Sequence, residues 1–90
     1  MKTVVTLEEY TGYYTDSPRE LPAPVSIETR HEPHEYGAHF VRAETLPNGD
    51  VVEYYYSHIE YQGRTPTGYR HCECGGLVAD TPGHAVVVTH

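Results

Sequence analysis

The clearest pattern in the chain is a pair of runs rich in tyrosine and valine within residues 36–61, separated by a polar break. Side chains of these types fit the pleated surface of a β-strand, and the break, Pro47-Asn48-Gly49-Asp50, consists of turn-forming residues. Asn-Gly supplies the two positive φ angles that a type I′ turn requires. The pattern therefore predicts a central β-hairpin over residues 36–61.

A type I′ turn at Asn48 and Gly49 would fix which residues of the two strands face each other, with Leu46 opposite Val51. Because side chains alternate between the faces of a sheet, one face is expected to be the core and the other an outer surface. The expected core face holds His39, Val41, Ala43, Thr45, Val52, Tyr54, Tyr56 and His58. The expected outer face holds Phe40, Arg42, Glu44, Leu46, Val51, Glu53, Tyr55 and Ile59.

The N-terminal segment predicts a short helix over residues 7–14. Thr6 to Glu9 has the form of a capping box, and apolar side chains follow at helical spacing. Gly12 weakens this prediction, and the alternative is a first strand over residues 3–7. Residues 15–24 are rich in proline, which removes amide donors, so this segment is predicted to be a loop or an extended arm.

Shorter runs of strand-forming residues occupy 25–30, 69–74 and 85–89. The expected fold class is α+β or all-β: a single small antiparallel sheet of roughly four or five strands with one short N-terminal helix. A chain of 90 residues has too little surface to bury for a second core, so residues 1–90 are expected to form a single domain.

Charge narrows the choice of partner. The chain has 13 acidic and 6 basic residues, giving a formal net charge of −7, and the basic residues are scattered. Direct binding of DNA or RNA needs a basic surface and is disfavoured, whereas a partner with a basic surface is favoured. No stretch approaches the roughly 20 apolar residues of a membrane span, and the start of the chain lacks the apolar core of a signal peptide. A cytoplasmic location is therefore expected.

Nine tyrosines make the chain unusually rich in a side chain that binding surfaces favour, because tyrosine offers large contact area at low entropic cost. A strand cannot bury Tyr54, Tyr55 and Tyr56 on one side, so Tyr55 is expected to point away from its two neighbours. Either a partner or a second layer of this domain, such as the N-terminal helix, would cover it. The candidate partner-binding residues are Tyr55, Glu53, Glu44, Tyr13, Tyr14 and Tyr61.

Cysteine and histidine gather near the end of the sequence, where thiolate and imidazole are the ligand types of structural zinc. The candidate metal ligands are Cys72, Cys74, His84, His90 and His71. One residue separates the two cysteines, fewer than the usual zinc spacing and too few for an easy disulfide between them. The alternative is that these side chains bind no metal. The chain has no nucleophile elbow and no phosphate-binding loop, so an enzyme is not expected.

These observations favour a small acidic protein-binding module, such as an inhibitor or accessory protein that acts on a basic partner surface. One alternative is a small zinc-binding structural module, and another is a structural protein that assembles with copies of itself. In size, and in having one lysine against five arginines, the chain resembles the small proteins encoded by bacteriophages of high-GC hosts. That resemblance implies a location in the host cytoplasm.

Overall fold

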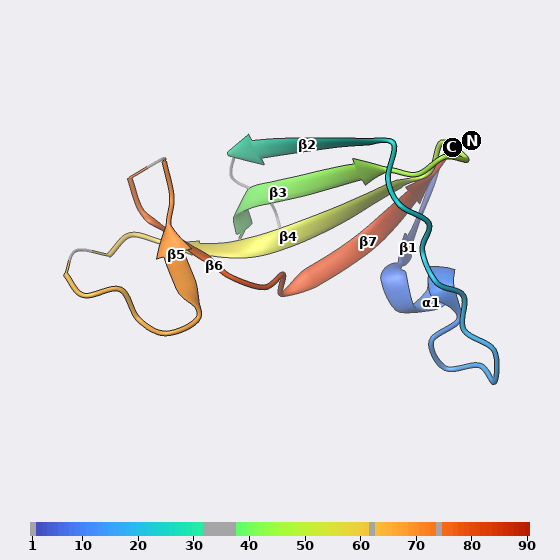
Figure 1. Cartoon of the computed structure of the whole chain (residues 1–90), viewed down its shortest axis with the longest axis horizontal. Helices are drawn as coiled ribbons and strands as arrows, with labels where there is room; N and C mark the ends of the chain where they lie inside the picture. Colours follow the sequence, from blue (N-terminus) through green and yellow to red (C-terminus); the bar gives the residue numbers. More distant parts are fainter. Residues whose placement is uncertain (1, 32–37, 62, 74) are drawn as a thin grey trace. The chain divides into compact units, whose positions relative to one another are not determined.

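The computed structural model describes residues 2–31, 38–61, 63–73 and 75–90. It is mostly antiparallel sheet with one short N-terminal helix (Figure 1), which confirms the predicted fold class. Among the described residues, no helix has the length and apolar character needed to span a bilayer. The elements are β1 (Thr3–Thr6), α1 (Leu7–Thr11), β2 (Ser26–His31), β3 (Ala38–Thr45), β4 (Val51–Ile59), β5 (Tyr69–His71), β6 (Leu77–Ala79) and β7 (His84–Thr89).

Within the described residues the sheet has seven strands, with the order β1-β7-β4-β3-β2 and with β6 paired to both β4 and β5. This exceeds the predicted four or five. The predicted strand over 69–74 is shorter, since β5 ends at His71, and β6 was not predicted. The proline-rich residues 15–24 contain no helix or strand, as predicted.

Both predictions for the N-terminal segment hold in part, because β1 leads directly into α1. The Thr6 hydroxyl accepts a hydrogen bond from the Glu9 N–H at 3.1 Å, which is one half of a capping box. The helix ends at Thr11 rather than at residue 14 because Gly12 takes a left-handed φ of 71° and its N–H bonds the Glu8 carbonyl.

The chain divides into two compact units. The first comprises Met1–Glu28, Ala43–Glu53 and Ala85–His90, and the second comprises Thr29–Arg42 and Tyr54–His84. The core of the first contains Ala43, Leu46, Val52, Val86 and Val87. The core of the second contains Val41, Tyr55, Tyr56, Leu77 and Val78. That residues 1–90 fold as a single domain stays a prediction.

The turn of the central hairpin differs from the predicted type I′ turn. That turn needs a positive φ at both Asn48 and Gly49, but only Gly49 has one, at 95°. The Gly49 N–H donates to the Leu46 carbonyl at 3.0 Å, and the Leu46 N–H donates to the Asp50 carbonyl at 2.8 Å. These bonds describe a type I turn followed by a glycine bulge, which places Leu46 opposite Asp50 instead of Val51.

This shift by one residue exchanges the faces of β4 relative to β3, so the predicted core and outer faces are wrong. The Arg42 guanidinium carbon lies 4.9 Å from the ring centroid of Tyr54 and 5.7 Å from that of Tyr56. The rings of Phe40 and Tyr56 meet nearly perpendicular, with centroids 5.3 Å apart. Tyr54 and Tyr56 therefore share the face of Phe40 and Arg42, and Tyr55 lies on the other face.

Candidate partner-binding site

The position of α1 is fixed by a polar cluster around Asp50, all within the first unit. Asp50 is only 7% exposed. The Tyr10 hydroxyl donates to Asp50 Oδ2 at 2.8 Å, and the Asn48 side-chain amide donates to the same oxygen at 3.1 Å. On the other oxygen, Oδ1, His90 Nδ1 lies at 2.8 Å and the His90 backbone N–H donates at 3.2 Å. The cluster therefore ties α1, the hairpin loop and the residue after β7 to one carboxylate.

The hydrogen bond from Tyr10, followed by that from His90, lowers the pKa of the Asp50 carboxyl below its ordinary value of 3.8. A lowered pKa in the folded state means that the ionised carboxylate stabilises the fold above the ordinary pKa. This stabilisation is lost as the pH falls through the lowered value.

We therefore expect the stability of the wild-type chain to fall more steeply than that of Asp50→Asn between about pH 5 and about pH 2. Urea unfolding at a series of pH values measures both profiles. Asp16→Asn, which changes an exposed carboxylate of the same unit, should follow the wild-type profile. Parallel profiles for the wild type and Asp50→Asn would contradict the assignment.

Arg19 fastens the proline-rich segment back onto α1. Its backbone N–H donates to the Thr11 carbonyl at 2.7 Å, and its guanidinium donates to the Tyr10 carbonyl. The guanidinium carbon also lies 5.1 Å from the centroid of the Tyr10 ring, which is a cation–π distance. Tyr10 is thus held by contacts with both Asp50 and Arg19, which fix the position of the helix. Tyr13 and Tyr14 follow directly after this helix.

Tyr13 and Tyr14 lie in the turn that closes α1. The Tyr13 N–H donates to the Glu8 carbonyl at 3.0 Å, and the Thr15 N–H donates to the Gly12 carbonyl at 2.9 Å. These bonds hold the two tyrosines beyond the left-handed cap at Gly12. Their rings meet edge to face, with centroids 5.1 Å apart and an interplanar angle of 89°.

The two rings are exposed and form walls of a shallow pocket of about 490 Å³, which we call the Tyr13/Tyr14 site. Tyr13 is 65% exposed and Tyr14 is 85% exposed. The site is lined by Leu7, Glu8, Thr11, Tyr13 and Tyr14. An exposed aromatic pair beside a carboxylate offers rigid contact area and negative charge together. The first unit also exposes the apolar side chains Val4, Val25 and Ile27.

The other candidate binding residues are placed differently. Tyr55 is only 4% exposed within this chain, and its role in partner binding stays a prediction. Its ring centroid lies 6.1 Å from that of the His84 ring, and its carbonyl accepts a hydrogen bond from the Gly83 N–H. The sequence had left open a partner or a second layer of this domain, such as the N-terminal helix, as the cover of Tyr55. Glu44 and Glu53 are half-buried and neither is without a partner.

Tyr61 is the remaining predicted tyrosine, and it is 46% exposed in the second unit. The tyrosine content of the sequence pointed to Tyr13 and Tyr14, but it did not connect them with the other lining residues Leu7, Glu8 and Thr11. Helical spacing was the available signal, because residues three and four apart share one face of a helix. The structure brings the two exposed rings and the Glu8 carboxylate together at one pocket beside α1.

The candidate zinc ligands that the structure describes make separate contacts. Within the described part of the chain, no three side chains of His, Cys, Asp or Glu are grouped to hold a metal ion. His71 Nε2 lies 2.8 Å from the Thr65 hydroxyl, His84 faces Tyr55 and His90 contacts Asp50. Cys74 lies outside the described residues. The zinc module therefore stays a prediction.

Cys72 is disulfide-bonded, which corrects the expectation that the cysteine spacing is too short for an easy disulfide. A sulfur in a disulfide cannot serve as a thiolate ligand, which restricts the zinc hypothesis to the reduced chain. Disulfides are rare in cytoplasmic proteins, and the cytoplasmic location also stays a prediction.

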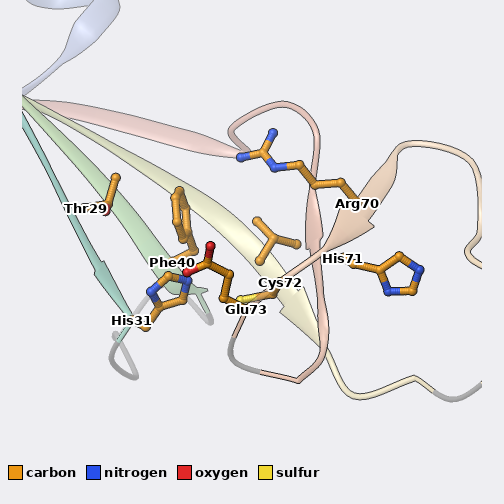
Figure 2. A pocket seen from close by; sticks show the side chains of 8 residues that line it. Thr29, His31, Phe40, Arg70, His71, Cys72 and Glu73 are labelled. Carbon is orange, nitrogen blue, oxygen red and sulfur yellow. The ribbon is translucent and has the colours of Figure 1, made fainter.

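A second pocket, of about 320 Å³, lies in the second unit (Figure 2). Its lining includes His31, whose ring lies 4.9 Å from that of Phe40, and Arg70, whose guanidinium carbon lies 5.9 Å from the Phe40 centroid. Figure 2 shows His71 pointing away from Phe40 and His31. With Cys72 in a disulfide, the described lining offers no thiolate nucleophile.

Comparison with protein families, with curated proteins and with solved structures finds no match.

Proposed function

We propose that the chain is a small acidic protein-binding module that docks a basic segment of another protein at the Tyr13/Tyr14 site. The observation that supports this most is the exposed, perpendicular pair of rings on a base fastened by Tyr10 and Asp50. Exposed tyrosines on a rigid support lose little conformational entropy on binding, which is why such residues dominate binding energy.

Charge supports a basic partner. The first turn of α1 carries Glu8 and Glu9, and its last turn carries no basic residue. Together with the net charge of −7, these carboxylates would steer a basic surface toward the rings and speed the encounter. Once bound, the chain would cover the basic surface of the partner and exclude the anionic ligands that this surface binds. Inhibition of the partner is therefore the expected consequence.

The proposal predicts that the double variant Tyr13→Ala/Tyr14→Ala binds its partner about tenfold or more weakly than the wild type. The immobilised chain would be incubated with a lysate of a high-GC bacterium, the kind of host that the resemblance to bacteriophage proteins implies. The captured protein would then be identified and its binding titrated. Binding by the wild type should also weaken as salt rises from about 0.1 M to about 0.5 M, because exposed charges are screened.

Tyr61→Ala is the matched control, since it removes an exposed tyrosine outside the site. It should bind like the wild type. All three proteins should have similar thermal midpoints because the changed rings are exposed. Capture that survives the double substitution, or that is indifferent to salt, would contradict the proposal.

A further inference from the structure

The Tyr13/Tyr14 site has the features of a receptor for one particular side chain of a basic segment. We propose that it takes the guanidinium group of an arginine, stacked on a tyrosine ring and paired with the Glu8 carboxylate. This inference rests on the proposed function and adds the chemical group that is recognised.

The rings give the first argument. The two rings line one pocket with their planes at 89°, so a planar cation stacked on the face of one ring can direct its N–H edge at the face of the other. The negative face of an aromatic ring attracts a cation within about 6 Å of its centroid. The exposure of Tyr13 and Tyr14 leaves this surface accessible.

The carboxylate gives the second argument. Glu8 lines the same pocket as the two rings, whereas Glu9, the next residue of the same helical turn, does not. A guanidinium presents its donors in a planar fork, so it can stack on a ring and still bond both oxygens of a carboxylate. An ammonium group is a compact, strongly hydrated charge and gains less from this combination.

The arginines of the chain itself give the third argument. Arg19 lies over the ring of Tyr10 at 5.1 Å, Arg42 over Tyr54 at 4.9 Å, and Arg70 over Phe40 at 5.9 Å. Three of the five arginines therefore lie over aromatic rings. Within the described residues, the Tyr13 and Tyr14 rings have each other but no such cation. An arginine of a partner would give the Tyr13 and Tyr14 rings the same cation–π contact that the chain's own arginines make with other rings.

The test is a titration of the full-length chain with a capped tetra-arginine peptide and with a capped tetra-lysine peptide of the same charge. Binding would be followed by the NMR signals of Tyr13 and Tyr14. We expect the arginine peptide to bind about two- to fivefold more tightly than the lysine peptide. Tyr13→Phe/Tyr14→Phe should keep this preference, and Tyr13→Ala/Tyr14→Ala should abolish it.

Glu8→Gln and Glu9→Gln form a matched pair, because each removes one negative charge from the same helical turn. Glu8→Gln should weaken arginine binding about two- to fivefold, and Glu9→Gln should change it less than twofold. Equal effects of the two substitutions, or equal affinities for the two peptides, would show that only net charge matters and would overturn the inference. If capture of the partner still depended on Tyr13 and Tyr14, the proposed function would survive that failure.

Discussion

Gly76→Ala is expected to lower the free energy of unfolding by about 3 kcal/mol. A Cβ atom added at Gly76 would lie 2.7 Å from the Ile59 carbonyl oxygen and 2.7 Å from His58 Cε1. The His58 ring could rotate away, but the Ile59 carbonyl belongs to the backbone of β4. Ile59 is also paired with Leu77 of β6, so relieving the clash means moving two paired strands.

Gly83→Ala is the matched control, because its added Cβ would meet only the Ser57 hydroxyl at an ordinary 3.9 Å. It should change the free energy of unfolding by less than about 1 kcal/mol. Urea unfolding followed by circular dichroism measures both variants. If Gly76→Ala were as stable as Gly83→Ala, the close approach of residue 76 to β4 would be wrong.

Local signals in the sequence predicted those parts of the fold that depend on neighbouring residues. The start of α1 was predictable because the bond from Glu9 to Thr6 spans three residues. The end of α1 was not, because the apolar spacing continued to Tyr14 while the left-handed conformation of Gly12 ended the helix. The strands β5 and β6 are three residues each, which is too short for alternation to show.

The hairpin shows how a correct element can carry the wrong register. Asn48-Gly49 fits both a type I′ turn and a type I turn followed by a glycine bulge. Pro47 was the signal that separates them, because proline favours the second position of a type I turn, which it occupies here. The Asp50 N–H donates to the Asn48 side-chain oxygen at 2.9 Å, which further holds the observed loop.

The candidate site was predictable only in part, for a similar reason. Composition pointed to Tyr13 and Tyr14, but their support depends on contacts between distant residues. Tyr10 and Asp50 are 40 residues apart, as are Asp50 and His90, and no spacing rule connects them. A buried aspartate of this kind becomes visible only when the fold brings its donors together.

Tyr55→Ala is expected to have the largest effect on stability, about 3–5 kcal/mol, because it removes a large buried side chain and leaves a cavity. Tyr55 is 4% exposed and packs near His84 in the core of the second unit. A domain of this size typically has a total stability of about 5–13 kcal/mol, so the variant would lose much of it. Urea unfolding followed by circular dichroism measures the loss.

Tyr61→Ala removes a tyrosine that is 46% exposed and should cost less than about 1 kcal/mol in the same measurement. The pair of variants also decides between the two covers that the sequence left open for Tyr55, a partner or this domain itself, of which the structure shows the second. A Tyr55→Ala variant with wild-type stability and lost partner capture would support the partner surface. If Tyr55→Ala unfolds at a much lower urea concentration while Tyr61→Ala is unchanged, Tyr55 is a core residue. Recognition of the partner is then left to Tyr13 and Tyr14.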